Sequence, residues 1–265
     1  MARWLGNWGV IRRSEYDELK QLIASHSHAA SMEQHIRAQL KDADPEFLAH
    51  FERCKAYTMT GTERLYALFA SVKYIVAANI PGELVETGVW RGGSGMMMAL
   101  TLLQLGTPDR SIRLFDTFEG HPEPDPEKDI DLWGTRGVDQ LAQHKRQNPG
   151  VGWAAVSIDE VRANIDSTGY PPHLVKLVKG MVEDTAPRNV PDQIALLRLD
   201  TDWYASTRAS LEAFYDRLER GGVLLIDDYG HYQGQRQAVD EFLAARAQNL
   251  LLTRIDYGCR LAIKR

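Results

Sequence analysis

Two pairs of carboxylates follow separate apolar runs in the carboxyl-terminal third of the chain. The run "LLRLDTDWYAST" carries Asp200 and Asp202, and the run "VLLIDDYG" carries Asp227 and Asp228. If these runs are neighbouring strands, four carboxylates meet at one sheet edge, where they repel each other unless a cation is present. Ligands that are all oxygen favour Mg²⁺, Ca²⁺ or Mn²⁺. The alternative role of helix caps requires one acid rather than four.

A glycine-rich segment, "ETGVWRGGSG", is the second stretch that predicts chemistry. Ser94 stands where a phosphate-binding loop needs Lys, and Trp90 replaces the central Gly of the dinucleotide fingerprint. The remaining pattern, E-x-G-x-x-x-G, is typical of loops that bind S-adenosylmethionine (SAM). Glu86 suits the positive charges of that ligand, and Gly88 and Gly92 let the backbone approach it closely. A glycine-rich turn without a ligand stays open as an alternative.

Further polar residues are expected near the same edge. Asp116 ends the run "LFDTF", where an acid can accept hydrogen bonds from both ribose hydroxyls. The segment "KGMVEDT" is placed so that it could flank an adenine. His121 and His231 are interpreted as solvated loop histidines, and Trp133 as a loop residue that packs, stacks on a sugar or shields the site.

Alternating helical and strand patterns must position these residues. We expect strands at 83–88, 112–116, 173–180, 194–200 and 222–227, and helices at 94–105, 205–219 and 234–247. This alternation predicts a largely parallel sheet with helices on both faces. Two last strands, 250–256 and 259–265, are joined by "YG" and must be antiparallel. Ligands in such sheets bind beyond the carboxyl ends of the strands.

Composition limits the class of protein. The 265 residues include 31 basic and 36 acidic side chains, and the net charge of −5 argues against binding nucleic acid. Cys54 and Cys259 have no metal-ligand spacing and are expected to be reduced thiols. No apolar stretch is long enough to span a bilayer. We therefore expect a soluble, cytoplasmic protein that binds neither a membrane nor nucleic acid.

Five motifs, in order along the chain, resemble those of the macrocin O-methyltransferase family. They are "YTMTGTERLYAL", "ETGVWRGGS", "LFDTFEG", "LDTDWYAST" and "LLIDDYG". The resemblance implies a Rossmann-like α/β fold of the class I SAM-dependent methyltransferases, with a seven-stranded, mostly parallel sheet and an antiparallel last strand. It places the methyltransferase domain at 61–265, after a helical extension or lid at 1–60. A Pro-rich and acidic segment, 119–134, is expected to be a mobile surface loop or second lid.

The resemblance also implies roles for individual residues. Asp202, Asp227 and Asp228 are expected to bind Mg²⁺ or Mn²⁺, and Asp200 to be the general base. The residues expected to bind SAM are Thr58, Met59, Thr60, Glu86, Gly88, Arg91, Gly92, Gly93, Ser94, Asp116, Phe118 and Asp200.

The function that we expect is methyl transfer from SAM to a sugar hydroxyl of a glycosylated natural product, such as a macrolide-type antibiotic. The resemblance further implies a homo-oligomer whose partner is a small-molecule glycoside. Two alternatives stay open. A catechol-type O-methyltransferase would also use a metal-chelating diol, and a non-catalytic SAM-binding module would need no acid cluster.

Overall fold

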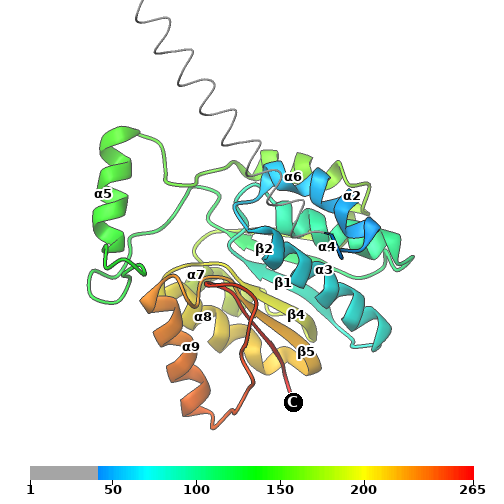
Figure 1. Cartoon of the computed structure of the whole chain (residues 1–265). Helices are drawn as coiled ribbons and strands as arrows, with labels where there is room; N and C mark the ends of the chain where they lie inside the picture. Colours follow the sequence, from blue (N-terminus) through cyan, green and yellow to red (C-terminus); the bar gives the residue numbers. More distant parts are fainter. Residues whose placement is uncertain (1–40) are drawn as a thin grey trace, which may run out of the picture. The chain divides into compact units, whose positions relative to one another are not determined.

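A computed structural model of the chain describes residues 41–265 (Figure 1). Pro45–Arg265 forms one compact unit. The predicted extension at 1–60 lies mostly outside the described residues, and its boundary at residue 60 stays a prediction. Its last part is described: α2 (Pro45–Cys54) packs on α4 within the compact unit, where Phe47 is completely buried.

The predicted seven-stranded sheet is confirmed, with the order β3-β2-β1-β4-β5-β7-β6. The strands are β1 (Glu83–Thr87), β2 (Ile112–Asp116), β3 (Val175–Lys179), β4 (Ile194–Leu199), β5 (Leu218–Ile226), β6 (Thr253–Arg254) and β7 (Arg260–Ile263). The first five are parallel, and β7 is antiparallel to both of its neighbours. Strand order reverses between β1 and β4, and this switch point is where ligands bind in sheets of this kind.

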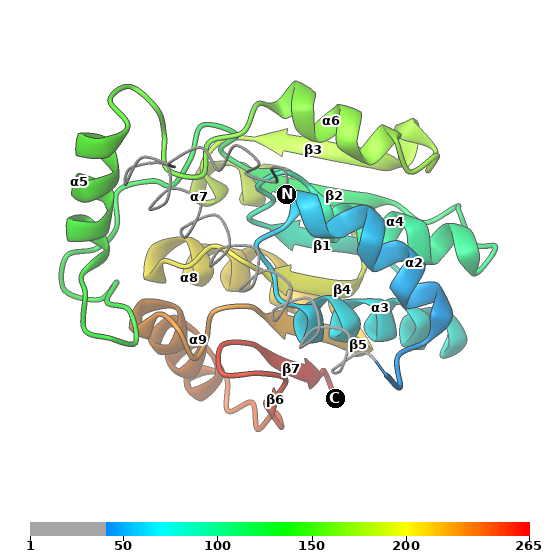
Figure 2. The same cartoon turned by 45° about the horizontal axis from the view of Figure 1, so that its top comes forward.

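Helices cover both faces of the sheet (Figures 1 and 2). On one face lie α2, α3 (Thr62–Ala77), α4 (Gly93–Gln104) and α6 (Ile158–Asp166). On the other lie α7 (Val182–Thr185), α8 (Tyr204–Phe214) and α9 (Gln233–Ala245). The helix α5 (Gly137–Gln147) stands apart from the sheet in both views. Short 3₁₀ turns complete the fold at Lys55–Tyr57, Pro172–Leu174, Ala186–Arg188 and Tyr215–Arg217.

Local sequence explains where several helices begin and end. Apolar residues at helical spacing, including Leu65, Leu68 and Val72, bury one face of α3. Ser157 caps α6 by accepting a hydrogen bond from the Glu160 N–H at 3.2 Å, as its capping sequence predicts. The predicted helix 205–219 ends earlier, at Phe214, because Leu218 already begins β5. Among residues 41–265, no helix combines the length and apolarity needed to cross a bilayer.

The strand register aligns the carboxyl ends of three strands. Thr87 of β1 is paired with Leu199 of β4, which is in turn paired with Ile226 of β5. The Asp200 N–H donates to the Thr87 carbonyl at 2.8 Å, and the Asp227 N–H donates to the Leu199 carbonyl at 2.9 Å. The residues that follow these three strands therefore leave the sheet at the same edge and side by side.

The segment 119–134 differs from the predicted surface loop at two buried acids. Asp129 is completely buried and Asp131 nearly so. The Asp129 Oδ1 accepts a hydrogen bond of 2.7 Å from the Tyr204 N–H, at the start of α8. Asp131 forms a β-bridge with Tyr232. Both acids anchor the segment to the rest of the protein, because a buried carboxylate needs hydrogen-bond donors and main-chain N–H groups supply them here.

Candidate active site

A cavity of about 470 Å³ opens at the carboxyl ends of the strands, where the sequence predicts the ligand site. The predicted site residues in its lining are Thr58, Met59, Thr60, Gly88, Ser94, Asp116, Asp200, Asp202, Asp227 and Asp228. The predicted residues outside the lining are Glu86, Arg91, Gly92, Gly93 and Phe118. The segment after β3, from Gly180 to Glu183, also lines the cavity. The strand ends thus bring together residues that are far apart in the sequence.

The glycine loop, residues 88–93, is shaped by contacts within the protein. Gly88 has φ of +84°, and a Cβ there would lie 1.8 Å from the carbonyl oxygen of Asp200. A Cβ on Gly93 would lie 2.6 Å from the carbonyl oxygen of Tyr57. Gly88 is predicted to let the backbone approach SAM, and Gly93 to bind it, and both stay predictions. The structure adds close contacts of both glycines with neighbouring backbone, which only Gly permits at such distances.

Asp116 organises the same loop through main-chain donors. Its Oδ2 accepts hydrogen bonds from the N–H groups of Val89 at 2.7 Å and Trp90 at 3.2 Å. Its Oδ1 accepts one from the Phe118 N–H at 2.7 Å. The carboxylate lines the cavity and is held in one orientation. With three main-chain donors already bound, it keeps room to accept a hydrogen bond from one ligand hydroxyl, whereas the ribose prediction calls for two.

Glu86 lies behind the cavity wall and is completely buried. Its Oε1 accepts hydrogen bonds from the Ser94 hydroxyl at 2.5 Å and from Arg198. Its Oε2 has no partner among the described residues. Burial raises the pKa of Glu86, while Arg198 and Ser94 act to lower it. The carboxylate is therefore tied to Arg198, and it lies outside the lining that a donor molecule would touch.

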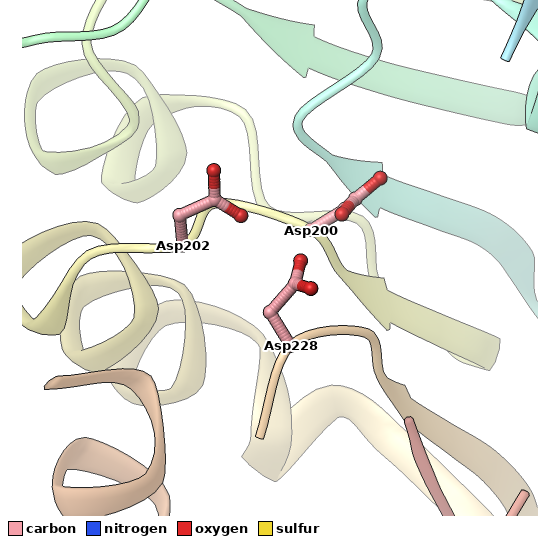
Figure 3. Close-up of side chains that lie close together, drawn as sticks. All are labelled: Asp200, Asp202 and Asp228. Carbon is pink, nitrogen blue, oxygen red and sulfur yellow. The ribbon is translucent and has the colours of Figure 1, made fainter. Parts of the chain in front are cut away.

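The acid cluster comprises Asp200, Asp202, Asp227 and Asp228, but its members are not equivalent. Asp200, Asp202 and Asp228 each offer an oxygen within 4.8 Å of the others (Figure 3). Asp202 has φ of +61°, an uncommon backbone conformation that marks candidate functional residues. Asp227 instead accepts a hydrogen bond from Arg64 on Oδ2 at 2.7 Å and one from Arg198 on Oδ1 at 2.6 Å. The predicted roles of the four acids stay predictions.

Two buried arginines that the sequence reasoning did not assign to the site hold this cluster. Arg198 also donates to the Oδ2 of Asp200 at 2.7 Å and to the Thr60 hydroxyl at 2.9 Å. Arg64 also contacts Asp228 at 3.2 Å and Asp256 at 2.7 Å. The signal for Arg198 was visible, because a charge inside the apolar run "LLRLD" must find buried partners. Arg64 had no comparable signal on its helix.

The cluster retains more carboxylates than the two arginines neutralise. Burial raises the pKa of Asp200 and Asp228 well above the usual value, and it raises the pKa of Asp202 to about 7. Burial alone would lower the pKa of Arg198, but Asp200, Asp227 and Glu86 hold it above the usual value. Partly buried, mutually repelling oxygen ligands are the donor set that a hard divalent cation satisfies. The residues present therefore fit Mg²⁺ or Mn²⁺.

An aromatic wall closes one side of the acid cluster. His121 contacts the rings of Trp153 and Trp203, at centroid distances of 4.8 and 5.4 Å, and the two tryptophan rings lie 6.1 Å apart. Its Nε2 is 3.5 Å from the Oδ2 of Asp202, and burial lowers the pKa of this histidine. The prediction of a solvated loop residue is wrong for His121, because the tryptophan rings exclude water from it. His231 is half-buried.

Comparison with known proteins gives consistent relatives. Residues 7–262 match the family described as macrocin O-methyltransferase (TylF). A Streptomyces olivaceus protein, 8-demethyl-8-(2,3-dimethoxy-α-L-rhamnosyl)-tetracenomycin-C 4'-O-methyltransferase, is 37% identical over 76% of this chain and 73% of its own. The mycinamicin III 3''-O-methyltransferase of Micromonospora griseorubida is 32% identical over 71% of this chain and 70% of its own.

Solved structures agree in fold. The O-methyltransferase NovP is 32% identical, with a TM-score of 0.68 over 78% of this chain and 82% of its own. The calicheamicin methyltransferase CalS11 has a TM-score of 0.57 over 98% of this chain and 99% of its own, and its 20% identity supports the fold alone. The match to nearly the whole sequence, together with the methyltransferase fold, shows that this chain is an O-methyltransferase and belongs to the macrocin O-methyltransferase family.

Proposed function

We propose that the protein transfers a methyl group from SAM to a sugar hydroxyl of a glycosylated natural product. The observation that carries this proposal is that the glycine loop and the acid cluster line one cavity. The names of two relatives support the acceptor class, because they specify methylation of a rhamnosyl group at the 4' position and of mycinamicin III at 3''. A 6-deoxysugar glycoside is therefore the acceptor that we propose.

The donor is proposed to lie along the glycine loop. Asp116, fixed by three main-chain hydrogen bonds, would accept a hydrogen bond from a ribose hydroxyl. Thr58, Met59 and Thr60 line the same side of the cavity and would enclose the methionine part. The donor would supply an electrophilic methyl group for direct displacement, so the task of these residues is orientation.

The acceptor is proposed to lie at the acid cluster. Asp202 and Asp228, which lie close to Asp200, would hold Mg²⁺ or Mn²⁺, which when bound lowers the pKa of a coordinated hydroxyl and orients it. Asp200 would take the hydroxyl proton on its carboxylate, whose Oδ2 is held by Arg198. Trp153 and Trp203 would keep water away from the exchanging proton. Assembly as a homo-oligomer stays a prediction that light scattering would test.

The direct test offers SAM with three acceptors: methyl α-L-rhamnopyranoside, an aryl α-L-rhamnopyranoside and catechol. We expect mass spectrometry to find one added methyl group on a rhamnoside, and we expect EDTA to abolish it and Mg²⁺ to restore it. Methylation of catechol alone would support the catechol-type alternative. Calorimetric binding of SAM, with no methylation of either rhamnoside, would contradict the proposed acceptor class. Activity that is unchanged in EDTA would contradict the role of the cation.

A further inference from the structure

Three aromatic side chains, Trp133, His231 and Tyr257, form a surface next to the cavity that the proposed mechanism does not use. The rings of Trp133 and His231 meet edge to face at 5.4 Å, and those of His231 and Tyr257 lie 5.8 Å apart. The Tyr257 hydroxyl is 3.2 Å from the Nδ1 of His231. Trp133 is 73% exposed and Tyr257 is 49% exposed. We call these three residues the aromatic rim.

The aromatic rim is continuous with the acid cluster. His231 and Tyr257 both line the cavity, and the His231 N–H donates to the Asp228 carbonyl at 2.9 Å. The guanidinium of Arg64 lies 5.4 Å from the centre of the Tyr257 ring and also contacts the Asp228 carboxylate at 3.2 Å. A molecule that reaches the acid cluster and extends out of the cavity on this side therefore meets the rim next.

Trp133 is exposed although its backbone is held in place. Its N–H donates to the Oδ1 of the nearly buried Asp131 at 2.9 Å, and the Thr135 N–H donates to the same atom at 2.8 Å. Asp131 also bridges to Tyr232, which contacts His231. Because the turn that carries this ring is already anchored, little conformational entropy is lost when a ligand covers the ring. Exposed apolar groups grouped beside a cavity mark binding surfaces.

We propose that the aromatic rim binds the aglycone of the acceptor, and that this aglycone carries a flat, largely apolar ring system. This inference rests on the proposed function. A cavity of about 470 Å³ is in the range of a pocket for one small molecule, yet it must hold both SAM and the sugar. The aglycone therefore lies at the edge of the cavity, across Tyr257 in its lining and Trp133 beyond it, where stacking on aromatic faces selects a flat ring over an alkyl group.

The test compares two glycosides that differ only in the aglycone: 2-naphthyl α-L-rhamnopyranoside and methyl α-L-rhamnopyranoside. With SAH and Mg²⁺ present, we expect calorimetry to show tighter binding of the naphthyl glycoside by wild type. Trp133→Ala should weaken the naphthyl glycoside about tenfold and the methyl glycoside less than twofold, because only the former reaches the rim. Trp133→Phe should recover part of the loss, since it keeps an aromatic face.

A matched control is Leu251→Ala, which removes a side chain that is 76% exposed and outside the cavity lining. It should leave both affinities unchanged. Equal affinity of wild type for the two glycosides, absence of binding by either, or an equal loss for both in Trp133→Ala would overturn the inference. Its failure is distinguishable from failure of the proposed function, because rhamnoside methylation is measured separately by mass spectrometry.

Discussion

The two halves of the cavity are built by different kinds of interaction. On the donor side, main-chain N–H groups orient Asp116, and Gly88 permits close backbone packing. On the acid side, oppositely charged side chains from distant elements neutralise one another, and Asp227 accepts hydrogen bonds from both Arg64 and Arg198. The donor side therefore depends on local backbone geometry. The acid side depends on buried charge, where removing one partner leaves another uncompensated.

The largest effect should come from Asp200→Asn, which is nearly isosteric and removes only the proposed proton acceptor. We expect kcat to fall roughly 10²–10⁴-fold, the usual contribution of a general base. Calorimetry should show that SAM binding is retained, because the donor side does not depend on this charge. In Asp202→Asn, excess Mg²⁺ should restore part of the activity. Rescue by Mg²⁺ of Asp200→Asn, but not of Asp202→Asn, would reverse the two assignments.

Removing a buried arginine should have the largest effect on stability. Arg198→Met leaves Asp227, Asp200 and Glu86 without this partner, and we expect it to lower the free energy of unfolding by about 3–5 kcal/mol. Urea denaturation measures this loss. Arg208→Met is the control, since Arg208 pairs with the exposed Glu212 one turn along α8, outside the cavity lining, and should cost about 0.5 kcal/mol. Similar losses in both variants would contradict the special role of the acid side.

The donor side can be tested with two glycines that both have positive φ. Gly88→Ala adds a Cβ that overlaps the Asp200 carbonyl, and we expect a loss of about 3 kcal/mol in the free energy of unfolding. Gly106 has φ of +68° and open space around its Cβ position, so Gly106→Ala should cost only about 1 kcal/mol. Because both variants strain the backbone and only Gly88→Ala also crowds a neighbour, the difference between their unfolding free energies measures the cost of crowding. Equal losses would show that the close approach is unimportant.

The smallest effect concerns pH. Burial raises the pKa of Asp202 from 3.8 to about 7, so the folded protein binds this proton more tightly than the unfolded chain does. The resulting stability is present at low pH and is lost as the pH rises from about 4 to about 7. Between pH 5 and 7.5 in EDTA, wild type should lose about 1–2 kcal/mol more than Asp202→Asn. Parallel pH profiles in urea denaturation would contradict a raised pKa.

Much of the donor side could be predicted from the sequence because its signals are local. The strand ends at Thr87 and Leu199, the helix that starts at Gly93 and the cap at Ser157 follow from short patterns of apolar, Gly and Ser residues. The predicted antiparallel end of the sheet was also a local inference, since a two-residue connection allows no crossover. The cap and the antiparallel pair are confirmed, and the two strand ends and the helix start lie one residue before the predicted positions.

Partners that are distant in the chain were not predictable in this way. Arg64 meets Asp227 and Asp256 across α3, β5 and the final hairpin, and no spacing in the sequence encodes that contact. The sequence indicates a solvated loop residue at His121, but packing places its ring against those of two tryptophans.

The sequence by itself determined the fold class, the family and the strand ends at which the acids gather. The reason is that hydrophobic periodicity, turn residues and motif order act over a few neighbouring positions. Only the tertiary structure decided that Asp200, Asp202 and Asp228 converge while Asp227 is paired with two arginines. Such pairing depends on strand register, burial and side-chain direction, which are properties of the assembled sheet and its helices.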